Sequence, residues 1–252
     1  MRLLLIEDTT QLAGPIAREL QDEHGHDVTW VKDPLEARSA AGTFDVAVID
    51  LLFEHLSFDF DRRRLARQVR PTRDQLLITG LTAVADLAQR SPSTKVVLWT
   101  SGEANRRLHL LYSAQELAIR SYCSKSSGTG KADTLHRAVL AAASDTEYVD
   151  PVLASYLPDR RSISIVQALL RDQTSLAIWR AVALGAHSRE EIQDLTGYDR
   201  RTIGNRMPML LNDLLSLDAG IMKPGKPLSE VVRFANRNWE FFLDAAVQSR
   251  HP

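Results

Sequence analysis

The chain has 252 residues, of which 44% are hydrophobic and 25% are charged, and its formal net charge is −1. This composition is that of a globular protein with room for one large domain or two ordinary ones, and it excludes a polycation that binds nucleic acid by charge alone. Cys123 is the only cysteine, so an internal disulfide and a cysteine zinc cluster are excluded.

The first half of the chain alternates short apolar runs with stretches of helical spacing. The runs at residues 3–6, 26–31, 46–49, 96–99 and 121–124 are typical of strands, and those at 11–22, 34–41, 76–89, 106–117 and 133–143 of helices. Such alternation predicts an α/β doubly wound parallel five-stranded sheet over residues 1–145.

Polar side chains stand just after four of the expected strands. Glu7 and Asp8 follow the first, Asp50 the third, Thr100 the fourth and Lys125 the fifth. The carboxyl ends of parallel strands share one edge of the sheet, where ligands bind. We therefore expect three carboxylates, a hydroxyl and an ammonium in one crevice, a set that suits a divalent cation and a phosphoryl group.

This pattern resembles the receiver domain of two-component response regulators. The resemblance implies a bound Mg²⁺ held by the acidic pair Glu7 and Asp8, by Asp50 and by the backbone carbonyl of Leu52. Mg²⁺ prefers oxygen ligands and typically takes one or two carboxylates together with waters and phosphate.

The same resemblance assigns roles in phosphoryl transfer. Asp50 would accept a phosphoryl group from a sensor histidine kinase, and Thr100 and Lys125 would bind the phosphoryl oxygens. Tyr122, three residues before the lysine, would act with Thr100 as a switch. Ser126 departs from the family pattern, in which a proline commonly follows the lysine.

The stretch between the third and fourth strands is longer than in most receivers. The excess, an arginine-rich insertion at about residues 52–74, comes directly after the expected acceptor, so it is expected near the mouth of the crevice. An elaborated surface loop, a lid, a dimer contact and a site for an anionic ligand are all open interpretations. Its arginines are Arg62, Arg63, Arg64, Arg67, Arg70 and Arg73.

Residues 146–162 are predicted to be a linker, and residues 163–252 an all-α helix-turn-helix domain. Two prolines break the linker, and helical segments are expected at 163–170 and 175–184. The sequence from Ser188 to Glu191 is a capping box that should begin a short helix. Gly197 suits the following turn, and Asp199 can cap the next helix.

The run from Glu191 to Ile203 resembles the LuxR-type output domain, which is often attached to receivers. The resemblance implies that the helix beginning at Arg200 enters the major groove of double-stranded DNA. Its candidate contacts to bases and phosphates are Arg200, Arg201, Thr202, Asn205 and Arg206.

Two features of this half depart from the family. Gly204 weakens the expected recognition helix, and Pro208 is predicted to kink or end it near Met207. Beyond a Pro-Gly turn, residues 228–247 have the spacing of one extra amphipathic helix. That helix is expected either to dimerise or to pack back on its own domain.

Together the two resemblances imply a cytoplasmic response regulator of a two-component system: a transcription regulator, expected to act as a homodimer, whose DNA binding is controlled by phosphorylation of Asp50. No membrane partner is expected, because no apolar stretch approaches the roughly 18 residues of a span. Two alternatives are an atypical receiver controlled by a ligand or protein partner and an adaptor that does not bind DNA. An enzyme is disfavoured, because Leu52 stands where many aspartyl phosphatases carry a second aspartate.

Overall fold

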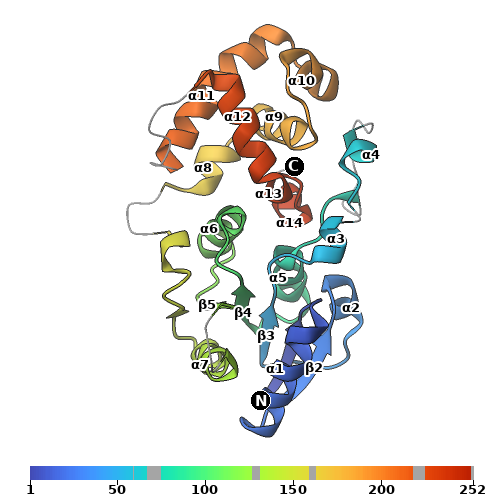
Figure 1. The fold of residues 1–252 in the computed structure, drawn as a ribbon, viewed down its shortest axis with the longest axis vertical. Coiled ribbons are helices and arrows are strands. Elements are labelled where there is room, and N and C mark those ends of the chain that lie inside the picture. Colours follow the sequence, from blue (N-terminus) through green and yellow to red (C-terminus); the bar gives the residue numbers. More distant parts are fainter. Residues whose placement is uncertain (59, 67–74, 127–130, 159–162, 218–224, 251–252) are drawn as a thin grey trace. The chain divides into compact units, whose positions relative to one another are not determined.

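The computed structural model describes residues 1–58, 60–66, 75–126, 131–158, 163–217 and 225–250. The chain divides into two compact units (Figure 1). An α/β unit comprises Met1–Phe58 and Ile78–Pro158, and a helical unit comprises Asp59–Leu77 and Asp159–Pro252. The helical unit is therefore built from two stretches of chain that are far apart in the sequence.

A parallel sheet with the strand order β2-β1-β3-β4-β5-β6 forms the centre of the α/β unit. The five predicted strands are present, and a short sixth strand pairs with β5 inside the range predicted to be linker. The strands are β1 (Arg2–Ile6), β2 (Asp27–Val31), β3 (Val46–Ile49), β4 (Lys95–Thr100), β5 (Ser121–Ser124) and β6 (Tyr148–Val149).

Side chains on both faces of this sheet are buried, because helices cover both faces. Leu3, Leu5 and Val48 pack against α1 (Thr10–Asp22) and α7 (Lys131–Ala143). Leu4 and Ala47 alternate with them along the strands and are also buried. The remaining elements are α2 (Pro34–Ser39), α5 (Gly80–Arg90), α6 (Arg107–Glu116) and the short 3₁₀ turns Ala104–Arg106 and Ala154–Tyr156.

The predicted arginine-rich insertion is divided between the two units. Its first helix, α3 (Glu54–Phe58), belongs to the α/β unit, whereas α4 (Arg62–Ala66) belongs to the helical unit. The expectation that the insertion lies at the crevice mouth fits α3, whose residues contact Asp8. Arg67, Arg70 and Arg73 lie outside the described residues.

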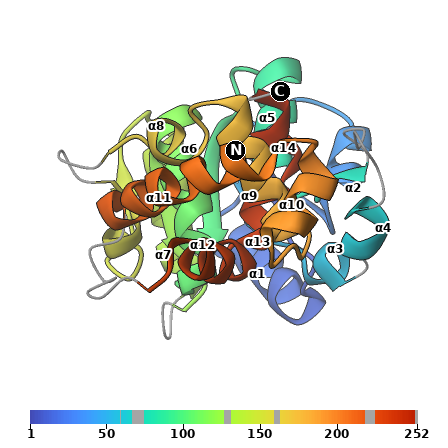
Figure 2. The same ribbon diagram turned by 90° about the horizontal axis from the view of Figure 1, so that it is seen from above.

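Seven further helices make up the rest of the helical unit in the part of the chain that the structure describes. Among them α9, α11 and α12 contact one another (Figure 2). The helices are α8 (Ile165–Leu169), α9 (Gln173–Ala183), α10 (Arg189–Thr196), α11 (Arg200–Leu217), α12 (Pro227–Arg237), α13 (Trp239–Phe242) and α14 (Ala245–Arg250). Across both units, no described helix is long and apolar enough to cross a bilayer.

An aromatic cluster forms the core of the helical unit. The ring of Trp179 stacks on Phe242 with centroids 4.9 Å apart and meets Phe234 at 5.8 Å. Trp179 and Phe242 are fully buried. Aromatic residues of this size bury enough apolar area to hold several short helices together.

The helix caps predicted for the helix-turn-helix are confirmed. Ser188 and Glu191 form the reciprocal capping box at the start of α10, and Gly197 ends that helix with φ of 75°. The Asp199 carboxylate accepts hydrogen bonds from the amides of Arg201 and Thr202, so it caps α11. These are local signals, and the sequence was sufficient to find them.

Of the two outcomes predicted for Pro208, a kink or an end of the helix near Met207, the end is wrong. α11 continues through Pro208 to Leu217. A proline inside a helix costs about 3 kcal/mol or more, because it removes one amide donor and crowds the preceding turn. Here Met207, Leu210 and Leu214 are buried on both sides of the proline, and that burial outweighs its cost.

The single helix predicted for residues 228–247 is also wrong, since three short helices occupy this range. The first break lies at Asn238, whose side-chain amide donates to the Phe234 carbonyl. The second lies at Asp244, whose carboxylate accepts hydrogen bonds from the amides of Ala246 and Val247 and so begins α14. Both breaks come from tertiary and capping interactions that helical periodicity does not reveal.

A buried histidine makes the α/β unit sensitive to acid. Burial lowers the pKa of His109, on α6, to about 3, with Arg106 acting in the same direction. The folded state then binds one proton fewer than the unfolded state between about pH 3 and 6.5, the ordinary histidine pKa. Stability is therefore fully present above about pH 6.5 and falls by ~1.4 kcal/mol per pH unit below it.

We expect denaturant unfolding of wild type and of His109→Gln, measured from pH 7.5 to 5, to show this slope in their difference. The unfolding free energy of the variant should fall less steeply with decreasing pH, by about 1.4 kcal/mol per pH unit, the slope that one proton contributes. Parallel curves for the two proteins would show that His109 is not kept neutral by the fold.

Candidate functional site

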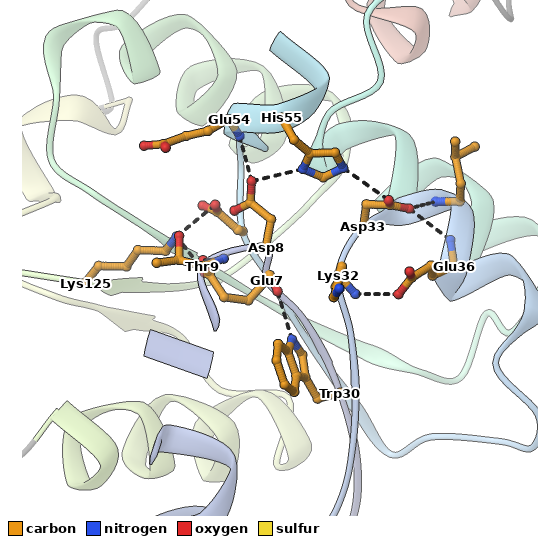
Figure 3. A network of polar contacts seen from close by, with 12 residues as sticks. Glu7, Asp8, Thr9, Trp30, Lys32, Asp33, Glu36, Glu54, His55 and Lys125 are labelled. Atoms are coloured by element: carbon orange, nitrogen blue, oxygen red, sulfur yellow. Dashed lines mark hydrogen bonds and ion pairs between the residues drawn. The ribbon is translucent and has the colours of Figure 1, made fainter. Parts of the chain in front are cut away.

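The sheet register brings the predicted site residues to one edge. The amide of Asp50 donates to the Ile6 carbonyl at 2.9 Å, and that of Lys125 donates to the Thr100 carbonyl at 3.0 Å. The parallel ladders therefore extend one residue beyond the strands. The side chains that follow β1, β3 and β5 consequently gather at the same end of the sheet, where Figure 3 shows those of Glu7, Asp8 and Lys125.

Lys125 lies at the centre of the site. Its Nζ is 2.6 Å from Glu7 Oε2 and 2.8 Å from Asp50 Oδ2. The Glu7 side chain is fully buried, that of Asp50 is 7% exposed and that of Lys125 is 16% exposed. Two buried carboxylates thus share one ammonium, which also lies 5.5 Å from the centre of the Trp99 ring.

Burial and the ion pair between Asp50 and Lys125 shift the pKa of each residue in opposite directions. Burial raises the pKa of Asp50, the nearby charge of Glu7 raises it further, and Lys125 opposes both. Burial alone would lower the pKa of Lys125, but Asp50 and Glu7 outweigh burial and raise it. The ammonium is therefore firmly protonated at neutral pH.

Glu7, Asp8 and Asp50 form a group that could hold a metal ion. One carboxylate oxygen from each lies within 4.8 Å of the other two. Oxygens bound to one Mg²⁺ at 2.0–2.1 Å are no farther apart than about 4.2 Å, so small side-chain movements suffice to bring them onto one ion. With Lys125 counted, the ionised group has two net negative charges, which a divalent cation would neutralise.

Asp8 is held in place by α3, which the sequence did not reveal. Its Oδ2 accepts a 2.7 Å hydrogen bond from the Glu54 amide and lies 3.2 Å from His55 Nδ1 (Figure 3). The other ring nitrogen of His55 lies 3.3 Å from Asp33 Oδ2. Burial alone would lower the pKa of His55, but its hydrogen bonds to Asp8 and Asp33 outweigh burial and raise it.

Nothing in the sequence singles out His55, because it lies five residues beyond the acceptor in a stretch without a matching family motif. Trp30 also matches no family motif, so the sequence did not reveal its contact with the site. Its indole N–H donates to the Glu7 carbonyl at 2.8 Å. Asp33 did carry a signal, since an aspartate before Pro34 is typical of a helix N-cap, and it caps α2.

The two predicted switch residues are both buried. The Thr100 hydroxyl has no hydrogen-bond partner among the residues that the structure describes. The Tyr122 ring is directed inward, where its hydroxyl donates to the Ile119 carbonyl at 3.0 Å and lies 3.1 Å from the Ser113 hydroxyl. Leu52 is buried beside the acceptor, and its carbonyl remains a predicted metal ligand.

The five predicted DNA contacts all lie in the first two turns of α11, but they are not equally available. Arg201 and Asn205 are exposed. Arg200 is exposed and pairs with Glu190 at 2.9 Å. Arg206 donates to Asp172, the N-cap of α9, at 3.0 Å and is only 21% exposed.

Thr202 is also engaged within the unit, because its hydroxyl donates to the Asp199 carboxylate at 2.9 Å.

Gly204 has a role that the sequence did not suggest. A Cβ at this position would lie 3.2 Å from Nη1 of Arg189, so the guanidinium of α10 lies against the bare backbone of α11. The exposed Arg189 thereby supplies a cation where Gly204 has no side chain.

Comparisons with known proteins give a likeness of fold alone. No family model and no curated protein matches the sequence. Among solved structures, RcsB of Salmonella enterica serovar Typhimurium, bound to the promoter rprA in the presence of BeF₃⁻, is 14% identical with a TM-score of 0.54, covering 94% of this chain and 98% of RcsB.

Two further RcsB structures agree with this likeness. The Salmonella typhimurium response regulator RcsB is 16% identical, and an RcsB–DNA complex is 15% identical. Each has a TM-score of 0.53 and covers 92% of this chain and 98% of RcsB. The chain thus has the two-domain fold of these response regulators.

Proposed function

We propose that the protein is a response regulator that binds DNA and is controlled by phosphorylation of Asp50. The observation that carries this proposal is the arrangement at the sheet edge, where three carboxylates lie close enough to share one cation and Lys125 lies 2.8 Å from Asp50. Phosphoryl transfer depends on alignment and charge neutralisation, and this arrangement supplies both.

The roles of the residues follow from their positions. Glu7, Asp8, Asp50 and the Leu52 carbonyl would hold Mg²⁺, which when bound neutralises the charge of the incoming phosphoryl group. Asp50 Oδ2 is the nucleophile, since Oδ1 already accepts the Leu51 amide at 2.7 Å. Lys125 would then move its ammonium from Asp50 to a phosphoryl oxygen.

Thr100 would report the phosphorylated state. Its buried hydroxyl has no partner among the described residues, so a phosphoryl oxygen would satisfy it. Tyr122 is already directed inward, so we propose that phosphorylation stabilises this position of the ring. A sensor histidine kinase is the proposed donor, and the cytoplasm the proposed location.

DNA binding is proposed for the exposed start of α11. Two of the RcsB structures carry DNA, and here Arg189, Arg200, Arg201 and Asn205 provide cations and an amide that are exposed. We propose that a homodimer presents two such helices to double-stranded DNA. Arg206, tied to Asp172, would hold α11 on α9 more than it contacts DNA.

The test combines labelling with a DNA titration. Acetyl phosphate and Mg²⁺ should add about 80 Da, one phosphoryl group, to wild type but not to Asp50→Asn. Phosphorylated protein should bind duplex DNA more tightly, with an affinity that falls as salt rises. Arg201→Ala should reduce the salt slope by about 1, whereas Arg120→Ala, an exposed change in the other unit, should leave it unchanged. Absence of the mass gain, beside a receiver that is labelled, contradicts the proposal.

An adaptor that does not bind DNA is the second candidate. It is favoured by the ion pairs of Arg200 with Glu190 and of Arg206 with Asp172, which engage two of the four arginines around α11. Labelling of Asp50 without salt-dependent DNA binding would support this function over the first.

A further inference from the structure

Residues 148–157, which lie within the predicted linker, are built into the α/β unit. The first two form β6, which pairs with β5 and is the edge strand of the described sheet. The last residues include the 3₁₀ turn Ala154–Tyr156, and Leu153 just before it is fully buried. This segment therefore belongs to the same compact unit as the acidic site.

Asp150, the residue after β6, holds the end of β5. Its amide donates to the Tyr122 carbonyl at 2.9 Å, and its Oδ2 accepts a hydrogen bond from the Ser124 amide at 3.3 Å. Its Oδ1 accepts the Val152 amide at 3.0 Å. Asp150 is only 3% exposed, so water has little access to these contacts. Both the backbone and the side chain of this one residue thus tie β5 to the segment.

These contacts lie directly before Lys125. The Lys125 amide donates to the Thr100 carbonyl on β4, while the preceding amide, that of Ser124, donates to Asp150 beyond β6. The backbone that leads into the lysine is therefore held from both neighbouring strands. Ser126 stands where receivers commonly have a proline, and serine does not fix its φ angle as proline does. In this chain the residue before the lysine provides the anchor.

The same segment also holds the chain that follows Thr100. The Tyr156 hydroxyl donates to the Gly102 carbonyl at 2.7 Å. A Cβ on Gly102 would lie 3.1 Å from Cγ1 of Val152, so the segment packs closely against bare backbone at this point. Both residues that are proposed to bind phosphoryl oxygens therefore lie within two positions of a contact with this segment.

We propose that Asp150 is a positioning residue for Lys125, and that Tyr156 has the same role for Thr100. The proposal rests on the function proposed above. The ammonium of Lys125 must reach a phosphoryl oxygen on Asp50, and a misplacement of about 1 Å can slow a reaction by up to about 100-fold. A strand end held on one side only leaves the lysine more positions to occupy. Asp150 acts in this way without touching the phosphoryl group.

Labelling of the full chain with acetyl phosphate and Mg²⁺ tests the proposal. Asp150→Ala removes the acceptor of two amides and should slow the mass gain on Asp50 by about ten-fold. Asp150→Asn keeps one acceptor oxygen, so its rate should lie between those of Asp150→Ala and wild type. The control is Glu147→Ala, which removes an exposed carboxylate three residues earlier and should be labelled at the wild-type rate.

A second measurement separates positioning from general stability. The carboxylates of the candidate metal site follow β1 and β3, so in calorimetric titration Asp150→Ala should bind Mg²⁺ alone at least as tightly as wild type. Its affinity for BeF₃⁻, a mimic of the phosphoryl group that is expected to contact Thr100 and Lys125, should fall by about ten-fold. Tyr156→Phe removes only a hydroxyl and should lose affinity for BeF₃⁻ by a smaller factor.

Each outcome decides one proposal. If wild type gains no mass, the proposed function fails. If wild type is labelled and either Asp150 variant is labelled as fast, the positioning role fails while the proposed function stands. Equal weakening of Mg²⁺ and BeF₃⁻ in Asp150→Ala also overturns it, because Asp150 then supports only the fold. If Asp150→Ala does not fold, Asp150→Asn and Tyr156→Phe decide, and wild-type behaviour of both contradicts the proposal.

Discussion

Lys125→Met is expected to lower the free energy of unfolding by about 3–5 kcal/mol at pH 8, because it leaves buried carboxylates without their cation. The ammonium of Lys125 lies 2.6 Å from Glu7 and 2.8 Å from Asp50, and the Glu7 side chain is fully buried. Methionine has a similar length and no charge, so the change removes the charge and leaves most of the packing. Guanidinium unfolding at several pH values measures the effect.

The sign of the pH dependence follows from Asp50. Burial already raises its pKa in wild type, and Lys125 is the main group that opposes this shift. Without the lysine, the folded-state pKa rises further above the unfolded value, so the contribution of a protonated Asp50 is present at low pH and lost as pH rises. The deficit of the variant should therefore be smaller at pH 5 than at pH 8.

Mg²⁺ should restore part of the stability of Lys125→Met, because the cation replaces the missing positive charge. The matched control is Lys95→Met, which breaks the pair of Lys95 with Asp145 at 2.9 Å. Both of those side chains are more than 40% exposed, so this loss should be at most about 1 kcal/mol. Equal losses in the two variants would contradict the central place of Lys125.

Gly80→Ala is expected to destabilise the α/β unit by about 3 kcal/mol and to abolish binding of Mg²⁺ and BeF₃⁻. A Cβ on Gly80 would lie 2.1 Å from the Asp50 carbonyl oxygen and 3.0 Å from the Leu51 Cα. Both are backbone atoms, so no change of rotamer relieves the overlap. The first turn of α5 or the acceptor itself must then move, although the Gly80 amide holds them together through the Leu51 carbonyl at 2.9 Å.

Gly204→Ala is the contrasting change. It also adds a methyl group to a helix, but the nearest atom belongs to the flexible, exposed side chain of Arg189 at 3.2 Å. That side chain can move, so alanine should stabilise α11 by up to about 1 kcal/mol. Thermal unfolding and titration with the mimic compare the two variants. Full binding by Gly80→Ala would show that the approach of α5 to Asp50 does not shape the site.

Local and periodic features of the sequence were sufficient to predict the α/β sheet and the helix caps. The strand ends carry Glu7, Asp8, Asp50 and Lys125 to one edge because all the strands run parallel. Cys123 is buried, as its place in a strand suggested. Each of these features depends on residues within one element, or on a topology that short connections enforce.

Long-range packing decided the features that the sequence did not reveal. Pro208 stays inside a helix because distant helices bury the residues on both sides of it. Arg206, a predicted DNA contact, also pairs with Asp172, the N-cap residue of α9. Both the helices that pack around Pro208 and the Asp172 partner of Arg206 lie more than ten residues away in the sequence, so no local pattern reveals these contacts.

The amino-acid sequence by itself determined the chemistry of the acidic edge, because strand ends and their polar residues are set by short-range periodicity. Only the tertiary structure decided that the arginine-rich insertion contributes α3 to that edge and Arg62 to the helical unit. Arg62 is positioned by the ring of Trp239 and by the end of α9, both more than a hundred residues away in the sequence, and these groups come together only when the helical unit folds.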